Sequence, residues 1–246
     1  MGTFSSHFFF YYLCGMKKVI TFISDTHTKH SQVTSQLPGG DLLVHAGDFS
    51  SRGYEHEVDA FFHWYNGLDD YTDKIVIAGN HDLMFEDDPM LAKDIMSYYP
   101  NVTYLQDDIE VIGEDYQSSV KVYGSPWQPE FYDWAFNLPR NGEELEEKWN
   151  EIPHNMDIVV THGPAWGHLD TVGGQSMNLG CELLAERLKV VKPKIHVCGH
   201  IHGGYGYKFH DGTHYFNVAV LGEDYIFTQK PMTVEWDSET NEINFL

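Results

Sequence analysis

The stretch HVCGHIHGG, residues 196–204, places three histidines within seven positions at the end of a short apolar run. The run KIHVC has the length and composition of a buried strand, so His200 and His202 follow the carboxyl end of that strand. Four other apolar runs of this chain end in polar clusters in the same way. The five clusters are Asp25 and His27 in ISDTH, Asp48 in VHAGD, Asn80, His81 and Asp82 in IAGNHD, His162 in VVTHG, and His200 and His202 in VCGHIH. Because the carboxyl ends of neighbouring strands in an open α/β sheet meet at one crevice, these clusters predict a single site.

The donor types in the clusters indicate a metal centre. Carboxylate, imidazole and amide side chains suit Mn²⁺, Fe²⁺ or Zn²⁺, and the lack of cysteine among them argues against a structural zinc site. Asp25 and His27 stand two positions apart, which in an extended chain points both side chains to the same side, and His200 and His202 repeat this spacing. The spacing therefore predicts that each pair holds one ion of a metal pair.

The ordered blocks DTH, GD, GNHD, THG and GHIH resemble the calcineurin-like metallophosphoesterase superfamily, from about Ile20 to Asn217. Within this region, GSPWQPEFYDWAFN and CGHIHGGYG resemble the metallophosphoesterase-domain-containing subgroup of cyclic-nucleotide-phosphodiesterase-like proteins. One block alone is a weak signal, whereas five ordered blocks at strand ends are a specific one. The resemblance implies an α/β fold, a four-layer αββα sandwich of two mixed β-sheets flanked by helices, with the metal site at the carboxyl ends of the central strands.

The resemblance also implies a role for each site residue. Asp25, His27 and His202 would surround one metal ion, Asn80, His162 and His200 the other, and Asp48 would bridge both. A hydroxide held between the two ions would attack the phosphorus, with Mn²⁺ as the expected metal and Fe²⁺, Fe³⁺, Zn²⁺ or Mg²⁺ as alternatives. His81 would bind the phosphate and protonate the leaving alkoxide, and Asp82 would orient the His81 imidazole. Arg52, in GDFSSRG, is a candidate phosphate ligand, with an ordinary surface arginine as the alternative.

The apolar pattern on its own predicts two sheets covered by helices. Buried strands are expected at 19–23, 41–44, 74–79, 157–163 and 194–200, and helices at 55–68, 89–98, 142–150 and 177–191. Short β-rich segments between 102 and 126 suggest antiparallel pairing, and those at 213–221, 232–237 and 242–246 are expected at an edge or in a second sheet.

One domain is expected over residues 16–246, with an aromatic-rich insertion at about 125–155. The aromatic side chains of this insertion either stack a base or sugar at the mouth of the site or form a satellite core, which is the favoured interpretation. They are Trp127, Phe131, Tyr132, Trp134 and Phe136. Residues 1–15 contain the apolar run HFFFYYLC without a preceding basic region or a cleavage site, so we expect a disordered or wrongly assigned N-terminal extension.

The composition narrows the partners and the compartment. With 37 acidic against 15 basic residues the formal charge is −22, which repels polyanions, so nucleic acid is not an expected partner. The apolar runs are too short to span a bilayer, so no membrane association is expected either. The cysteines Cys14, Cys181 and Cys198 show no metal-type spacing, which favours unpaired thiols in a reducing compartment, the cytoplasm. The oligomeric state is left open.

These features predict a metal-dependent hydrolase for small phosphodiesters, such as 2′,3′- or 3′,5′-cyclic nucleotides, in preference to phosphomonoesters. Two alternatives stay open. A nuclease would also use such blocks, but the acidic surface argues against it. A weakly catalytic scaffold or sensor would keep the site to bind metal and nucleotide, although the complete ligand set argues against a decayed centre.

Overall fold

Two mixed β-sheets carry the predicted site residues at their ends. The computed structural model describes residues 17–113, 119–173 and 177–246. Within these residues the strands form two sheets of six strands each and a short two-stranded ribbon. The expectation for residues 1–15 concerns positions outside the described residues.

The first sheet combines N-terminal and C-terminal strands. From edge to edge it contains β14 (Glu242–Phe245), β13 (Met232–Asp237), β1 (Lys17–Ile23), β2 (Gly40–His45), β3 (Tyr71–Val76) and β4 (Thr103–Tyr104). The strands from β1 to β4 run parallel, whereas β13 is antiparallel to both β1 and β14. The carboxyl ends of β1, β2 and β3 therefore lie along one edge of this sheet.

The second sheet is built from the later half of the chain. From edge to edge it contains β11 (Gly206–His210), β12 (Thr213–Asn217), β10 (Ile195–Cys198), β9 (Ile158–Thr161), β6 (Val120–Ser125) and β5 (Asp108–Ile112). The four central strands run parallel, and the two edge strands are antiparallel to their neighbours. The ribbon pairs β7 (Gln128–Pro129) with β8 (Asn137–Leu138).

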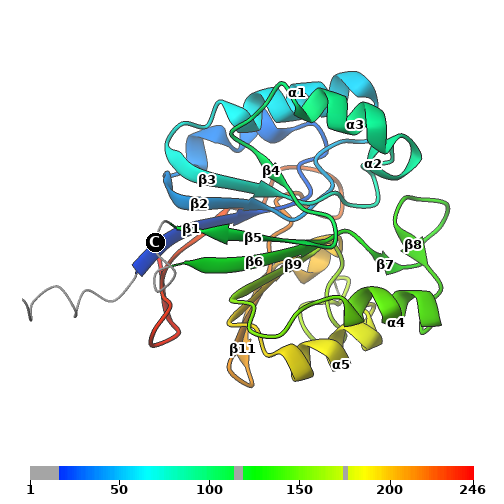
Figure 1. Ribbon diagram of the computed structural model, residues 1–246, viewed down its shortest axis with the longest axis vertical. Coiled ribbons are helices and arrows are strands. Elements are labelled where there is room, and N and C mark those ends of the chain that lie inside the picture. The colour runs from blue at the N-terminus through cyan, green and yellow to red at the C-terminus, as the bar shows by residue number, and fades with distance from the viewer. Residues whose placement is uncertain (1–16, 114–118, 174–176) are drawn as a thin grey trace, which may run out of the picture.

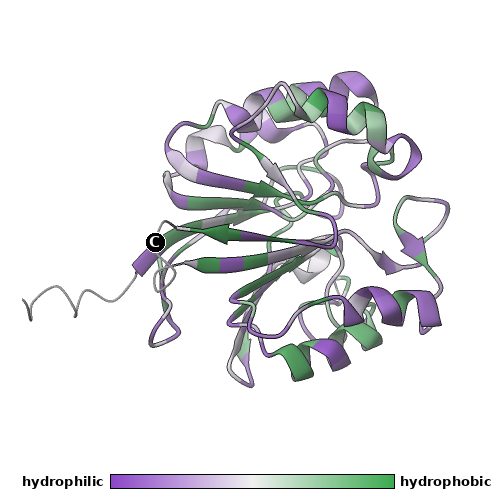
Figure 2. Cartoon of the chain, in the orientation of Figure 1, coloured by the Kyte–Doolittle hydropathy of each residue, from purple (hydrophilic) through white to green (hydrophobic). Residues whose placement is uncertain are grey.

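Helices cover the outer face of each sheet (Figure 1). The first sheet is covered by α1 (Glu55–Asn66), α2 (Met84–Asp87) and α3 (Pro89–Met96), and the second by α4 (Glu143–Asn150) and α5 (Glu182–Val191). Alternate residues of β1 face different layers, because Ile20 and Phe22 join the core between the sheets and Ile23 joins the core under α1. Hydrophobic residues follow the strands, whereas α4 is largely hydrophilic (Figure 2). The expected four-layer α/β sandwich is confirmed.

Several sequence-based expectations differ from the observed elements. The segment at 103–104 pairs parallel to β3 rather than antiparallel, so only β5 and β6 of the three short segments form a hairpin-like pair. The helix expected from 177 begins at Glu182, because Asn178 and Cys181 pair with Thr171 and Ala165 in isolated bridges. The helix α2 and the strands β7, β8 and β11 were not expected. None of the described helices combines the length and hydrophobicity needed to cross a bilayer.

Candidate functional site

Every predicted cluster lies directly after the carboxyl end of a strand. Asp25 and His27 follow β1, Asp48 follows β2, and the Asn80–Asp82 turn follows β3, all in the first sheet. His162 follows β9, and His200 and His202 follow β10, in the second sheet. The two sheets thus contribute to one site at the edge where their parallel strands end.

Four of these residues have left-handed backbone geometry. The φ angles are 54° at Asp25, 38° at His27, 56° at Asp48 and 63° at His200. Such angles cost of order 1–3 kcal/mol for residues other than glycine and occur preferentially at functional sites. The sequence pattern predicted that Asp25 and His27 point to the same side because the backbone is extended. The two side chains do lie together, but a left-handed turn brings them together, so the predicted reason is wrong.

The first group of donors comprises Asp25, His27 and His202, whose ligand atoms lie within 4.8 Å of one another. The Nε2 atoms of His202 and His27 lie 3.3 and 4.0 Å from Oδ1 of Asp25. The Nδ1 atom of His202 lies 2.9 Å from the carbonyl oxygen of Gly222, which turns Nε2 toward Asp25. The backbone N–H of His200 donates to both carboxylate oxygens of Asp25, at 3.1 and 3.0 Å.

The second group comprises Asp48, His162 and His200 and is joined by Asn80. Nε2 of His162 lies 3.3 Å from Oδ2 of Asp48 and 3.0 Å from Oδ1 of Asn80. The same Oδ2 atom of Asp48 lies 3.7 Å from Nε2 of His27, so Asp48 is shared between the two groups. His200 and His202 belong to different groups, so the prediction from spacing that this pair holds one ion is wrong.

The four site imidazoles are of two kinds. Burial opposes protonation of His162 and His202, but the neighbouring carboxylates raise the pKa of each to about 9, so a bound cation would displace a proton from both. Burial lowers the pKa of His27 to about 4 and that of His200 to about 3, which keeps both imidazoles neutral and able to bind a metal ion. Burial opposes ionisation of Asp25, but the hydrogen bond and charge of His202 hold the pKa of Asp25 well below its usual range. Nε2 of His27 is buried and has no hydrogen-bond partner among the described residues. A cation at this position would be bound by the unpaired nitrogen of His27 and would balance the charge of the two neighbouring carboxylates.

The five clusters lie within a region that matches a known protein family. The family model described as calcineurin-like phosphoesterase matches residues 18–204, which include all five clusters. The chain belongs to the calcineurin-like phosphoesterase family. The phosphoesterase is 41% identical over 241 residues to metallophosphoesterase domain-containing protein 1 of Homo sapiens and of Mus musculus, an alignment that covers 89% of this chain and 71% of each relative. Its fold is similar to the crystal structure of TT1561 of Thermus thermophilus, with a TM-score of 0.63 at 13% identity, over 94% of this chain and 98% of that one.

His81 of the phosphoesterase lies beside the shared carboxylate. Its backbone N–H donates to Oδ1 of Asp48 at 2.8 Å, and its Nδ1 atom lies 2.8 Å from the carbonyl oxygen of Ser51. The ring of Trp134 stacks on the His81 ring with the centroids 4.0 Å apart and the planes at 27°. Of the predicted aromatic side chains, Trp134 and Phe131 therefore contact the site, whereas Phe136 is buried in the core under α1.

Arg52 of the phosphoesterase lies apart from the donor groups. Its guanidinium carbon lies 4.7 Å from the centre of the Trp134 ring. Arg52 lines a different hollow from the one that contains Asp48 and His81. The structure thus brings Arg52 to Trp134 rather than into the site, and its role as a phosphate ligand stays a prediction.

Asp82 has a different partner from the expected one. Its carboxylate accepts hydrogen bonds from the backbone N–H groups of Asp48, Gly79 and Ser50 at 2.9, 2.7 and 2.9 Å, and from the Ser50 hydroxyl at 2.7 Å. The carbonyl oxygen of Ser51, not Asp82, lies against Nδ1 of His81. The prediction that Asp82 directly orients the imidazole is therefore wrong, because Asp82 instead holds the loops that carry Asp48 and Asn80.

We expect Asp82→Ala to destabilise the phosphoesterase. The substitution leaves three buried backbone N–H groups without an acceptor, whereas the Ser50 hydroxyl can still donate to the carbonyl oxygen of His81. We expect the free energy of unfolding in urea to fall by about 3 kcal/mol. Asp94→Ala, at an exposed position of α3, serves as the control and should change stability by less than about 0.5 kcal/mol. A loss below about 1 kcal/mol for Asp82→Ala would contradict the role of this carboxylate as a loop anchor.

The two donor groups open into a hollow of about 340 Å³. Its walls include Asp48, Asn80, His81, Phe131, His200 and Tyr225. The Tyr225 ring contacts both imidazoles of the first group, with centroids 4.9 Å from His27 and 5.0 Å from His202. Sequence reasoning missed Tyr225, because it lies in an irregular loop after β12 and carries no motif.

Proposed function

We propose that this phosphoesterase hydrolyses small phosphodiesters, cyclic nucleotides among them, with two divalent metal ions. The carrying observation is that two donor groups, Asp25–His27–His202 and Asp48–His162–His200, share the Asp48 carboxylate. A shared carboxylate between two sets of imidazoles is the ligand arrangement of a two-metal hydrolase. Mn²⁺ is the proposed metal, because mixed oxygen and imidazole donors suit it.

Each donor has a proposed place. Asp25, His27 and His202 would hold one ion, Asn80, His162 and His200 would hold the other, and Asp48 would contact both. When bound, such ions lower the pKa of water and neutralise charge on the phosphoryl oxygens. The protein's part is to keep these side chains fixed, and the contacts of His202 with Gly222 and of His162 with Ala46, each through Nδ1, serve that purpose.

His81 is the proposed proton donor to the leaving group. The carbonyl oxygen of Ser51, 2.8 Å from Nδ1, would accept the Nδ1 proton, so the doubly protonated imidazolium would give its second proton from Nε2 to the leaving oxygen and become neutral. Stacking on Trp134 limits the rotation of the ring. His81 also lines the hollow, so the imidazole can reach a leaving oxygen there.

The partner we propose is a small phosphoester rather than a nucleic acid, because the formal charge of −22 repels a long polyanion. The cytoplasm is the proposed compartment, since Cys181 and Cys198 are free, buried thiols. A scaffold or sensor that binds metal and nucleotide is the second candidate. It is favoured if the metal-loaded protein proves inert.

The test compares bis-(p-nitrophenyl) phosphate with p-nitrophenyl phosphate after chelation and restoration of Mn²⁺, Fe²⁺, Zn²⁺ or Mg²⁺. We expect no hydrolysis by the chelated protein and, with Mn²⁺, a kcat/KM for the diester at least about tenfold above that for the monoester. Faster cleavage of the monoester would replace the phosphodiesterase proposal by a phosphomonoesterase. Bound metal without cleavage of either ester would favour the scaffold.

A further inference from the structure

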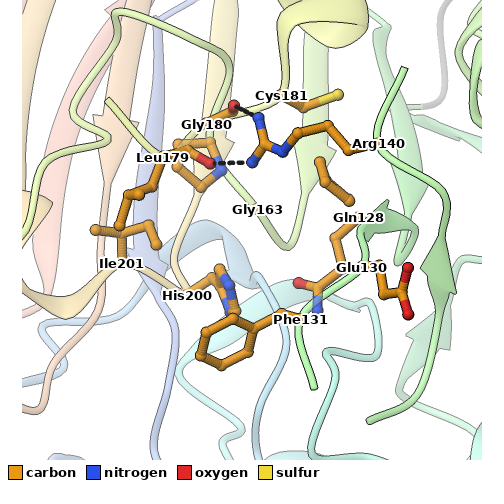
Figure 3. A pocket seen from close by; sticks show the side chains of 12 residues that line it. Gln128, Glu130, Phe131, Arg140, Gly163, Leu179, Gly180, Cys181, His200 and Ile201 are labelled. Carbon is orange, nitrogen blue, oxygen red and sulfur yellow. Dashed lines mark hydrogen bonds between the residues drawn. The ribbon is translucent and has the colours of Figure 1, made fainter. Parts of the chain in front are cut away.

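A second cavity, of about 120 Å³, opens beside the proposed metal centre (Figure 3). Phe131, His200 and Ile201 line both this cavity and the larger hollow, so the two are neighbours across the His200 side chain. An ester that occupies the larger hollow can therefore extend one substituent into this smaller cavity. Nothing in the proposed chemistry of the metal centre requires the smaller space.

One polar wall of the cavity is the Gln128 side chain, and Asn137 sets the orientation of this side chain. The Asn137 amide nitrogen donates to the carbonyl oxygens of Tyr132 and Phe131, at 2.9 and 3.3 Å. The Asn137 oxygen accepts from the Phe131 N–H at 3.2 Å and from Nε2 of Gln128 at 3.3 Å. The loop backbone thus fixes the orientation of the Asn137 amide, with its oxygen toward Gln128. This oxygen accepts a hydrogen bond from the NH₂ group of Gln128 and so orients the Gln128 amide as well.

The opposite end of the Gln128 amide is left without a partner. Gln128 is only 1% exposed, and its Oε1 atom is buried without a hydrogen-bond partner among the described residues. In Figure 3 this oxygen points into the cavity, toward His200. A buried acceptor that stays unpaired costs about 1–3 kcal/mol, so the site is built to receive a donor from a bound group.

The remaining walls select against a second anionic group. Arg140 lies across the cavity from Gln128, but its guanidinium donates to the carbonyl oxygens of Leu179 and Gly180 and pairs with Glu182 at 2.6 Å (Figure 3). The positive charge of Arg140 is therefore already matched. Of the other side chains in the lining, Phe131, Leu179 and Ile201 are apolar, His200 is a proposed metal ligand, and Glu130 is an exposed carboxylate that repels a second anion. A second phosphate would find no free cation among the described residues that line this cavity, whereas a neutral ring would bury its surface against carbon.

We propose that Gln128 determines specificity by accepting a hydrogen bond, through Oε1, from a neutral, ring-sized substituent of the phosphoester that carries an N–H or O–H donor. This inference rests on the proposed function for its substrate, but it concerns one substituent and one residue rather than the metal chemistry. A site built for a hydrogen bond rejects an analogue that lacks the donor, because the buried acceptor then stays unpaired.

The test uses two diesters that differ by one hydroxyl: p-nitrophenyl phenyl phosphate and p-nitrophenyl meta-hydroxyphenyl phosphate. We expect the Mn²⁺-loaded wild type to favour the hydroxyphenyl ester by about tenfold in kcat/KM. Gln128→Leu should reduce this preference to within about twofold, mainly by slowing the hydroxyphenyl ester. Gln32→Leu, the same change at an exposed glutamine of a short 3₁₀ turn, is the control and should keep the preference.

A binding measurement separates this inference from turnover. Calorimetry with phenylphosphonate and meta-hydroxyphenylphosphonate should show the same preference in the wild type and its loss in Gln128→Leu. Gly163→Ala provides a second variant, since its Cβ would lie 3.7 Å from Cβ and 3.9 Å from Oε1 of Gln128 without a clash and would occupy part of the cavity. We expect it to weaken binding of both phosphonates.

The outcomes distinguish the two proposals. Equal cleavage and equal binding of the paired compounds by the wild type would overturn the role of Gln128, and the unpaired oxygen would then be satisfied by water alone. Discrimination between the phosphonates without cleavage of either ester would support the role of Gln128 and count against the proposed hydrolysis. If Gln128→Leu still prefers the hydroxyphenyl compounds, another residue must cause the preference, and the inference is overturned.

Discussion

Asp48→Asn is expected to lower kcat/KM for bis-(p-nitrophenyl) phosphate by at least about 10³-fold and to reduce bound Mn²⁺ in the same preparation. The Oδ2 atom of Asp48 lies 3.3 Å from Nε2 of His162 and 3.7 Å from Nε2 of His27, so this one carboxylate serves both donor groups. Asparagine has nearly the same volume, but it removes one negative charge and one of the two acceptor oxygens. The loss should therefore fall mainly on metal binding and rate, with a smaller loss of folding stability.

The fold of this variant is expected to persist. Burial opposes the charge of Asp48, but the attraction to His162 and the other imidazoles outweighs this cost and holds the pKa of Asp48 well below its usual range, so the neutral side chain should lower stability. The chelated variant should melt several degrees below the chelated wild type in one cooperative transition, and metal content measured by mass spectrometry should account for the lost rate. Asp94→Asn, on the exposed face of α3, is the matched control. Full metal content with full activity in Asp48→Asn would refute the shared-carboxylate site.

Gly79→Ala should disable the same centre by crowding. A Cβ at Gly79 would lie 2.5 Å from the backbone nitrogen of Asp48 and 2.6 Å from Cε1 of His162, well inside van der Waals contact. The Asp48 loop or the imidazole has to move, and a displacement of about 1 Å at a reacting centre costs on the order of 100-fold in rate. We also expect a loss of about 2 kcal/mol in the free energy of unfolding, because the neighbours are packed and the Gly79 N–H donates to Asp82.

Gly67→Ala is the control for this crowding effect. A Cβ at Gly67, after α1, would meet the carbonyl oxygens of His63 and Trp64 at 3.5 and 3.6 Å, which is ordinary contact. Enzyme assays and urea unfolding of both variants, run side by side, separate a general response to a methyl group from a response at the site. Wild-type kinetics in Gly79→Ala would mean that the loops around Asp48 are looser than the packing indicates.

The layers of the fold and the candidate donors were predictable from sequence, because both depend on short local patterns. Buried strands are continuous apolar runs, and the polar residues after each run, such as Asp48 and His162, must lie at the carboxyl edge of a parallel sheet. Which strands pair with one another was harder to predict from the sequence. Nothing in the residues of β4 indicates whether this strand pairs parallel to β3 in the first sheet or antiparallel to a strand of the second sheet.

The errors concern arrangements that arise only from contacts between distant segments. The left-handed backbone at Asp25 and His200 is imposed by the surrounding loops, since these residue types do not demand it. Asp82 follows His81 in sequence, yet its carboxylate faces the amides of a loop more than thirty positions earlier. The hydrogen bonds that link Tyr132, Asn137 and Gln128 are local by contrast, but no sequence motif marks them.

The pairing of β1 with β13 has a consequence for how the protein matures. Asp25 and His27 follow β1, and β1 lies between β2 and β13 in the sheet. One neighbour of β1 is therefore synthesised near the end of the chain, since Lys17 pairs with Asp237. During synthesis the ribosome therefore releases the donors of the first sheet long before the strand that completes their support. The donors of the second sheet, His162 and His200, also emerge earlier than β13. We therefore expect the metal ions to bind after β13 has been synthesised. The identity of the bound metal should then depend on the metal ions available to the folded protein rather than on those around the ribosome-bound chain.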